Sequence, residues 1–187
     1  QDDVEILIQL VWLGLIVQII EGTFYVWLAK HIDIISNITK YRYYDWFFST
    51  PTMLITLVVY LLYLKDLEDN KKNQTTKKQD IERSAKKSNN NLWSYMADNK
   101  GILSIILVLN AIMLLFGYYG EVGVMTIEKS VIFGFIPFII YFYLIYEHFA
   151  KYSERGIYLF ILFTSIWSFY GISALMPYYV KNIAYNL

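Results

Sequence analysis

Five polar residues interrupt one long apolar stretch of the chain at spacings that place them on a single face of a helix. Arg42, Asp45, Ser49, Thr52 and Thr56 fall within an arc of about 80° at 100° per residue. In a membrane helix a charged side chain costs about 2.5–3.5 kcal/mol, so such residues mark functional sites. A packing role for an Arg–Asp pair would account for the first two residues but not for the three hydroxyls.

A second polar stripe precedes the first. Gln18, Glu21 and Tyr25 lie within about 60° of one another on a helix. Their functional interpretation is an ion or proton path between the two stretches, and the structural alternative is a protonated glutamate hydrogen-bonded to a neighbouring helix. Asn110 is the one strongly polar side chain in the middle of a later apolar stretch, where such residues usually form interhelical hydrogen bonds.

The high hydrophobic content of the chain predicts that the helices carrying these polar stripes lie in a membrane. The 187 residues are 57% hydrophobic and 17% charged, with 16 Lys and Arg balancing 16 Asp and Glu. This excludes a disordered chain and argues against a soluble globular domain. The absence of cysteine and the presence of two histidines exclude a disulfide framework and a plausible metal site. No nucleophile–base pair is present, so an enzyme is not expected.

Five apolar runs are long enough to cross a bilayer core, which takes roughly 20 helical residues. We predict an all-α transmembrane helical bundle, with spans at 4–29, 43–64, 102–119, 131–146 and 157–176. A sixth segment is expected to start after Pro177. The chain is read as a single transmembrane domain, 1–187, in which 65–100 is a polar loop.

The basic residues predict the orientation. Segments 65–100 and 147–156 should share one side and hold eleven of the 16 Lys and Arg. By the positive-inside rule that side, including the loop 65–100, is cytoplasmic.

The first stripe also carries a family pattern. Residues 41–54 read YRYYDWFFSTPTML, which resembles the R-Y-x-D-W-x-x-T-T-P pattern in the third helix of microbial rhodopsins. Trp167, Tyr170 and Gly171 resemble the sixth-helix motif W-x-x-Y-P, with glycine in place of proline. Asn110, Met113 and Gly117 resemble the fourth helix. Residues 117–121 and 181–187 look most like the viral rhodopsins of giant viruses.

The resemblance implies a seven-helix fold, of which this chain would supply helices two to six and the start of seven. The first helix is then missing. The lysine that binds retinal is expected about six residues beyond Leu187, and Lys181 lies two to three turns too early to replace it.

The resemblance further implies all-trans retinal as cofactor and a role for each matched residue. Asp45 would be the Schiff-base counterion and proton acceptor, and Arg42 would hold it ionised by charge pairing. Thr50 and Asn110 resemble the hydrogen-bonded pair that slows or gates the photocycle in channelrhodopsins. The residues expected around the retinal are Trp46, Ser49, Met53, Met113, Gly117, Trp167 and Tyr170.

Three functions stay open at this point. A light-gated cation channel is favoured, with Gln18, Glu21, Tyr25 and Thr56 along the ion path, because carboxylate-lined paths favour cations. An outward proton pump is the alternative, although Thr56 stands where such pumps carry a carboxylate donor. A retinal-free membrane protein or sensory relic of the fold is the third. The expected partners are the lipid bilayer, transported cations or protons and further copies of the chain in a homo-oligomer, and nucleic acid is not expected.

Overall fold

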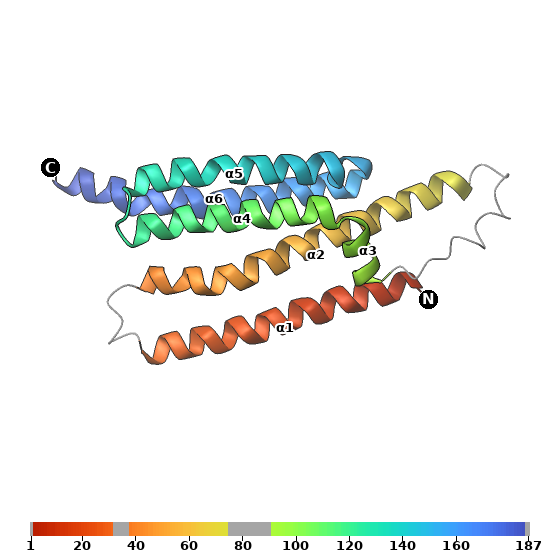
Figure 1. The fold of residues 1–187 in the computed structure, drawn as a ribbon, viewed down its shortest axis with the longest axis horizontal. Helices are drawn as coiled ribbons and strands as arrows, with labels where there is room; N and C mark the ends of the chain where they lie inside the picture. The colour runs from red at the N-terminus through yellow and green to blue at the C-terminus, as the bar shows by residue number, and fades with distance from the viewer. Residues whose placement is uncertain (1, 32–37, 75–90, 186–187) are drawn as a thin grey trace.

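A computed structural model describes residues 2–31, 38–74 and 91–185 as helices joined by short turns. Figure 1 shows five long helices lying side by side, with a short sixth across one end. In chain order the elements are α1 (Asp2–Lys30), α2 (Ile38–Gln74), α3 (Leu92–Asp98), α4 (Lys100–Glu121), α5 (Ile127–His148), the 3₁₀ turn η1 (Ala150–Tyr152) and α6 (Glu154–Tyr185). The predicted all-α architecture is confirmed.

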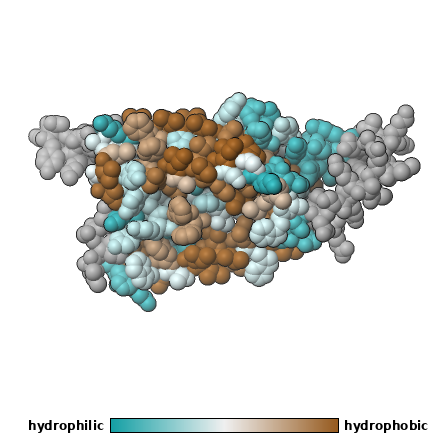
Figure 2. Space-filling view, in the orientation of Figure 1, coloured by the Kyte–Doolittle hydropathy of each residue, from teal (hydrophilic) through white to brown (hydrophobic). Residues whose placement is uncertain are grey.

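Five stretches of these helices are long and apolar enough to cross a membrane. They are Val4–Lys30, Lys40–Lys72, Lys100–Glu121, Ile127–Tyr152 and Glu154–Ser173. Figure 2 shows hydrophobic side chains gathered over the middle of the visible face and hydrophilic ones toward its ends. The chain is therefore an integral, multi-pass membrane protein.

Two boundaries differ from the prediction. The residues after Pro177, expected to begin a further helix, continue α6 to Tyr185. Proline removes one backbone donor, and membrane helices tolerate that loss. The segment 65–100, expected as a polar loop, is helical at both ends: α2 extends to Gln74, and residues 92–98 form α3. Residues 75–90 of that segment lie outside the described part of the chain.

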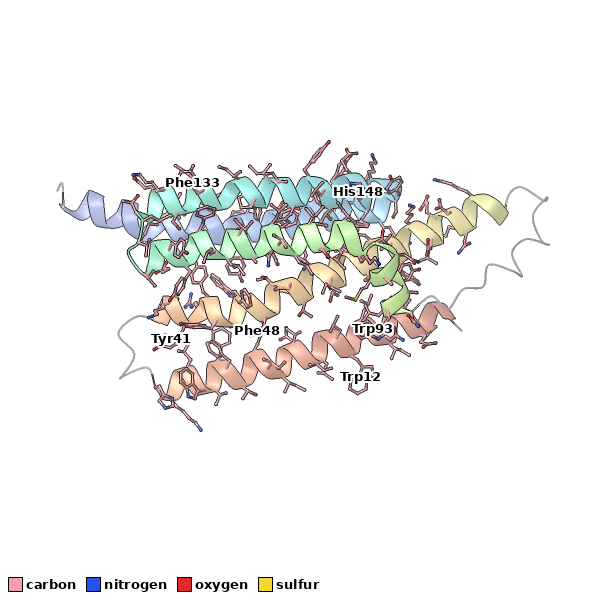
Figure 3. The ribbon with its side chains drawn as sticks, in the orientation of Figure 1. Trp12, Tyr41, Phe48, Trp93, Phe133 and His148 are labelled. Carbon is pink, nitrogen blue, oxygen red and sulfur yellow. The ribbon has the colours of Figure 1, made fainter. Side chains whose placement is uncertain are left out.

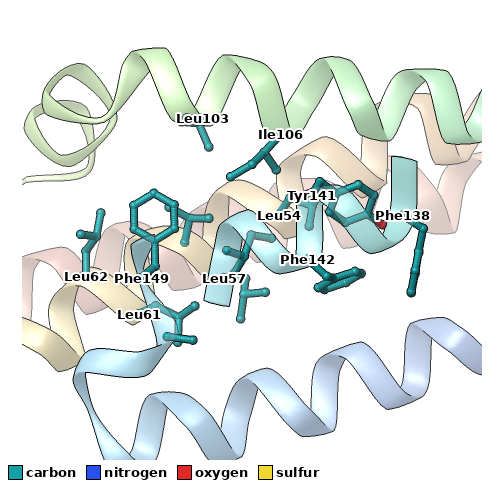
Figure 4. Packing of buried hydrophobic residues seen from close by; sticks show 13 residues of the cluster. Leu54, Leu57, Leu61, Leu62, Leu103, Ile106, Phe138, Tyr141, Phe142 and Phe149 are labelled. Atoms are coloured by element: carbon teal, nitrogen blue, oxygen red, sulfur yellow. The ribbon is translucent and has the colours of Figure 1, made fainter. Parts of the chain in front are cut away.

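The main core lies between α2, α4 and α5. Leu54, Leu57, Val58 and Leu61 of α2 meet Ile106 of α4 and a group of aromatic residues on α5. That group includes Phe138, Tyr141 and Phe142, and Figure 4 shows Tyr141 beside Ile106 and Leu54 and Phe142 on the side of α6. Lipid tails are as apolar as these side chains, so close packing and not exclusion from water holds the helices together.

Helix α1 stands apart from this core and packs chiefly on α2 and α3. Most of its apolar side chains face outward, and Ile6, Leu10 and Leu28 are its buried ones. The helices therefore form an arc in the order α1, α2, α4, α5, α6, with a groove beside α2, between α1 and α6, that has a largely apolar lining and a few polar side chains.

The turn between α5 and α6 is fixed to the end of α2. Ser153 is buried, and its hydroxyl accepts a hydrogen bond from the Gly156 backbone N–H at 3.0 Å. The Lys65 ammonium lies 4.3 Å from the centre of the Tyr152 ring. Lys65 and the turn between α5 and α6 therefore lie at the same end of the bundle.

We expect Gly156→Ala to destabilise this turn. A Cβ there would lie 3.0 Å from the Ala150 carbonyl oxygen and 3.3 Å from the Leu61 Cδ2. Such overpacking costs about 1–3 kcal/mol and should lower the thermal unfolding temperature in detergent. Gly101→Ala is the control, because nothing lies within 4 Å of its added Cβ. Equal unfolding temperatures for the two variants would contradict this account of the turn.

Candidate functional site

The polar face of α2 points into the bundle over most of its length. Asp45 and Ser49 are buried, at 7% and 3% exposure, and Thr52 and Thr56 are half-buried beside the groove. Arg42 is exposed near the start of the helix. The predicted stripe thus exists, with its cation at the bundle's end.

The threonine hydroxyls in this stripe are satisfied by their own helix. Thr52 donates to the Phe48 carbonyl at 3.0 Å, and Thr56 donates to the Thr52 carbonyl at 2.9 Å. Each hydroxyl proton is thus used in a hydrogen bond to a backbone carbonyl of the same helix. An oxygen lone pair of the hydroxyl then faces outward. The face therefore presents acceptors to the groove, which suits a cation or a water molecule.

The partner of Asp45 is on the neighbouring helix. The Tyr25 hydroxyl of α1 lies beside the Asp45 carboxylate, and Glu21 lies near enough for its charge to act on the same group. Tyr25 and Glu21 are one turn apart on α1. The two predicted stripes therefore face each other across the gap between α1 and α2.

The charge pairing expected between Arg42 and Asp45 does not take the form of a direct ion pair. Among the described residues no ion pair joins the two, and the charge of Arg42 acts instead on Glu121 at the end of α4. Arg42 precedes Asp45 by one turn toward the bundle's end, where its long side chain stays exposed. A charged head that reaches water avoids the cost of burial.

A cavity of about 320 Å³ lies between α1, α2 and α6. Its polar lining is Gln18 and Glu21 from α1 with Thr52 and Thr56 from α2, and Met53 and Phe163 supply part of its apolar wall. Three of the four residues predicted along an ion path thus meet at one cavity. The fourth, Tyr25, lies next to it at Asp45.

Helices α2 and α4 are joined by a buried hydrogen bond. Asn110 is fully buried, and its Nδ2 donates to the Thr50 hydroxyl at 2.8 Å, while that hydroxyl donates to the Trp46 carbonyl at 2.7 Å. These two hydrogen bonds therefore connect α4 to the α2 backbone at Trp46, the residue next to Asp45. The Asn110 Oδ1 is buried with no partner among the described residues.

The aromatic residues expected around the retinal are divided between two helices. Trp46 meets Tyr170 edge to face, with ring centres 6.1 Å apart, so α2 and α6 are in contact at this level. Trp167 packs on Phe163 at 4.9 Å and on Phe142 at 6.0 Å. These contacts place an aromatic wall on α6 facing the polar face of α2.

Two residues assigned to the retinal pocket also have contacts within the protein. A Cβ on Gly117 would lie 2.5 Å from the Tyr43 hydroxyl, so this glycine makes room for the Tyr43 ring. Met113 accepts a long hydrogen bond, 3.5 Å, from Tyr141. Sequence reasoning missed Tyr43, because its contact with Gly117 joins two helices far apart in the chain.

The residues present fit a retinal. Ligand cavities usually enclose about 300–1,000 Å³ and combine an apolar lining with a few polar groups, as the groove beside α2 does. Asp45 supplies a buried carboxylate that suits a cationic group. Of the apolar residues expected around a polyene, Met53 lines this groove, Trp46 and Tyr170 contact each other, and Trp167 packs on Phe142 and Phe163.

We expect Thr50 and Asn110 to be energetically coupled. In a double-mutant cycle with Thr50→Val and Asn110→Leu, the free energies of unfolding should deviate from additivity by about 0.5–3 kcal/mol, as for residues in contact. Thr56→Val combined with Asn110→Leu is the control, because the Thr56 hydroxyl bonds within its own helix. Additivity in both cycles would show that the hydrogen bond contributes nothing.

The comparisons agree with this architecture. No curated protein matches the chain. A family model described as "Bacteriorhodopsin-like protein" matches residues 6–186, nearly the whole chain. The chain belongs to the bacteriorhodopsin-like protein family, whose members are retinal photoreceptors and ion transporters and not enzymes.

Proposed function

We propose that this protein is a light-gated cation channel whose path runs between α1 and α2. Members of its family bind retinal through a lysine. Retinal in the all-trans form, bound as a protonated Schiff base, would supply a light-driven change of shape and charge. The residues proposed to hold it are Trp46, Ser49, Met53, Met113, Gly117, Trp167 and Tyr170.

Asp45 is the proposed counterion and proton acceptor. Its burial, at 7% exposure, leaves it little water to solvate its charge, so a cation beside it is strongly stabilised. Tyr25 of α1 lies beside the carboxylate. Arg42, which does not pair with Asp45, is proposed to interact with the carboxylate of Glu121 at the mouth of the path.

The cavity between α1, α2 and α6 is the observation that carries the channel proposal. Gln18 and Glu21 face Thr52 and Thr56 across it, so a carboxylate, an amide and hydroxyl oxygens surround one space. Oxygen ligands with a net negative charge favour cations over anions. Because α1 is loosely packed, with outward-facing apolar side chains along most of its length, it is the helix best able to move and widen this space.

An outward proton pump remains the second candidate, and the pairing of Asp45 with Tyr25 favours it. A carboxylate beside a hydroxyl in the middle of the bundle suits one-way proton transfer. Thr56, however, stands where the archaeal pumps carry their proton donor, and a hydroxyl is far too weak an acid to replace it.

Orientation and subgroup are part of the same proposal. The end that holds Lys65, α3 and η1 is proposed to be cytoplasmic, together with the segment 65–100, because basic residues concentrate there. The resemblance of 117–121 and 181–187 to viral rhodopsins supports that subgroup. A homo-oligomer in the bilayer is proposed as well.

Photocurrents from the retinal-bound protein test the proposal. The current should reverse at the equilibrium potential of the permeant cation, whereas a pump current would not reverse. Glu21→Gln should lower the cation current about fivefold, since one carboxylate contributes about 1 kcal/mol to a nearby cation in water. The absorption maximum should change little, because Glu21 lies outside the retinal-contact motifs.

Glu5→Gln is the matched control on the same helix. Glu5 is exposed near the start of α1, where Gln9 donates to it at 3.2 Å. Its loss should leave the current unchanged. Equal effects of the two substitutions would remove Glu21 from the path, and a light-driven current that never reverses would replace the channel with the pump.

A further inference from the structure

Helix α3 is held firmly on one of its faces. The Leu92 backbone N–H donates to the Gln9 Oε1 of α1 at 2.8 Å, and the Tyr95 hydroxyl donates to the Asp66 carboxylate of α2. Asn91 caps the helix, accepting from the Ser94 N–H at 2.9 Å. These bonds tie a seven-residue helix to two membrane helices at once.

Apolar packing fixes the same face. Leu92, Tyr95 and Met96 pack against a buried cluster of Ile6 and Leu10 from α1 and Val59 from α2. Two of the three buried apolar side chains of α1 belong to this cluster. Helix α3 therefore secures the loosely packed α1 to the bundle at this end.

The opposite face of α3 presents a tryptophan. Trp93 is 73% exposed although the helix that carries it is fixed on its other side. Figure 3 shows Trp93 on α3, next to α1, at the end of the bundle where α1 begins. The position of Trp93 relative to the membrane follows from the order of the helices. Helix α3 ends at Asp98, and the membrane-spanning part of α4 starts two residues later, at Lys100. Trp93 thus lies at the boundary of the apolar region.

We propose that α3 is an interfacial anchor and that Trp93 inserts into the lipid headgroup layer. Indole combines a large apolar ring with one N–H donor, and tryptophan accordingly concentrates at membrane–water interfaces. The rigid attachment of α3 presents this ring without a further loss of backbone freedom. The anchor would fix the depth of the α1 end, and with it the height of Gln18 and Glu21 along α2.

A bilayer is the partner that the observations favour over a protein. The exposed surface of α3 is one aromatic side chain followed by Ala97 and Asp98, which is too small for a stable protein interface. The five membrane-spanning helices place the surfaces next to α3 in contact with lipid. The inference is independent of whether the protein conducts ions.

Fluorescence quenching by brominated lipids tests the anchor. The full-length protein is reconstituted in vesicles whose acyl chains carry bromine either near the headgroup or near the bilayer centre. The difference between the parent and Trp93→Phe isolates the emission of Trp93. We expect this emission to be quenched about twofold more by the shallow bromines than by the deep ones.

Trp12→Phe supplies the matched control. Trp12 is 59% exposed on α1 and lies about 15 Å along the helix from its start, so its emission should respond more to the deep bromines. Trp93→Tyr, which keeps an interfacial aromatic, checks that any change comes from the probe and not from misfolding. Quenching of Trp93 by aqueous iodide with no effect of bromine would place it in water and overturn the anchor. Quenching by neither reagent would show a protein partner over α3 and would overturn it equally.

Discussion

The approach of Tyr25 to Asp45 is the contact on which the arrangement of the site depends. It joins a carboxylate of the well-packed helix α2 to helix α1, which lies outside the main core. A carboxylate in the bilayer core needs partners, because an unpaired polar group there costs several kcal/mol. Helix α1 supplies that partner, and in doing so it brings Gln18 and Glu21 to the cavity beside α2.

The site therefore combines a closely packed half and a more loosely packed half. Helices α2, α4 and α5 share a close-packed core, and Asn110 ties α4 to α2 through Thr50. Helix α1 depends on the contact at Tyr25, on its packing along α2, and on α3 at the other end. Elements with few buried contacts open most easily, and function that requires motion is expected to use them.

The sequence predicted the parts of the site that follow from helical spacing. The stripes on α1 and α2 could be placed because residues three and four apart share a helix face, and Thr50 and Asn110 could be paired from the family motif. Spacing alone did not indicate that the long Arg42 side chain is exposed and makes no direct ion pair with Asp45. The space at Gly117, which houses Tyr43, depends on packing between distant helices and has no local signal.

Helix α3 shows the limit of composition as a guide. It lies in a segment rich in Lys, Asn and Asp, which predicts a solvated loop. Its seven residues are too few to show a helical pattern of apolar side chains. Only the capping residues Asn91 and Ser94 indicate a helix. Tertiary contacts with Gln9 and Asp66 stabilise it, and these cannot be derived from its own sequence.

The most direct test of the account is the visible absorption of Asp45→Asn in the retinal-bound protein. An ionised carboxylate stabilises the ground state, in which the positive charge lies at the Schiff-base nitrogen, and excitation moves that charge away. Losing the carboxylate should narrow the energy gap and shift the absorption maximum to the red. Tyr25→Phe should produce a smaller shift, while Asp66→Asn, at the opposite end of α2, should produce none. An unchanged absorption maximum in Asp45→Asn would contradict the assignment of Asp45 as counterion.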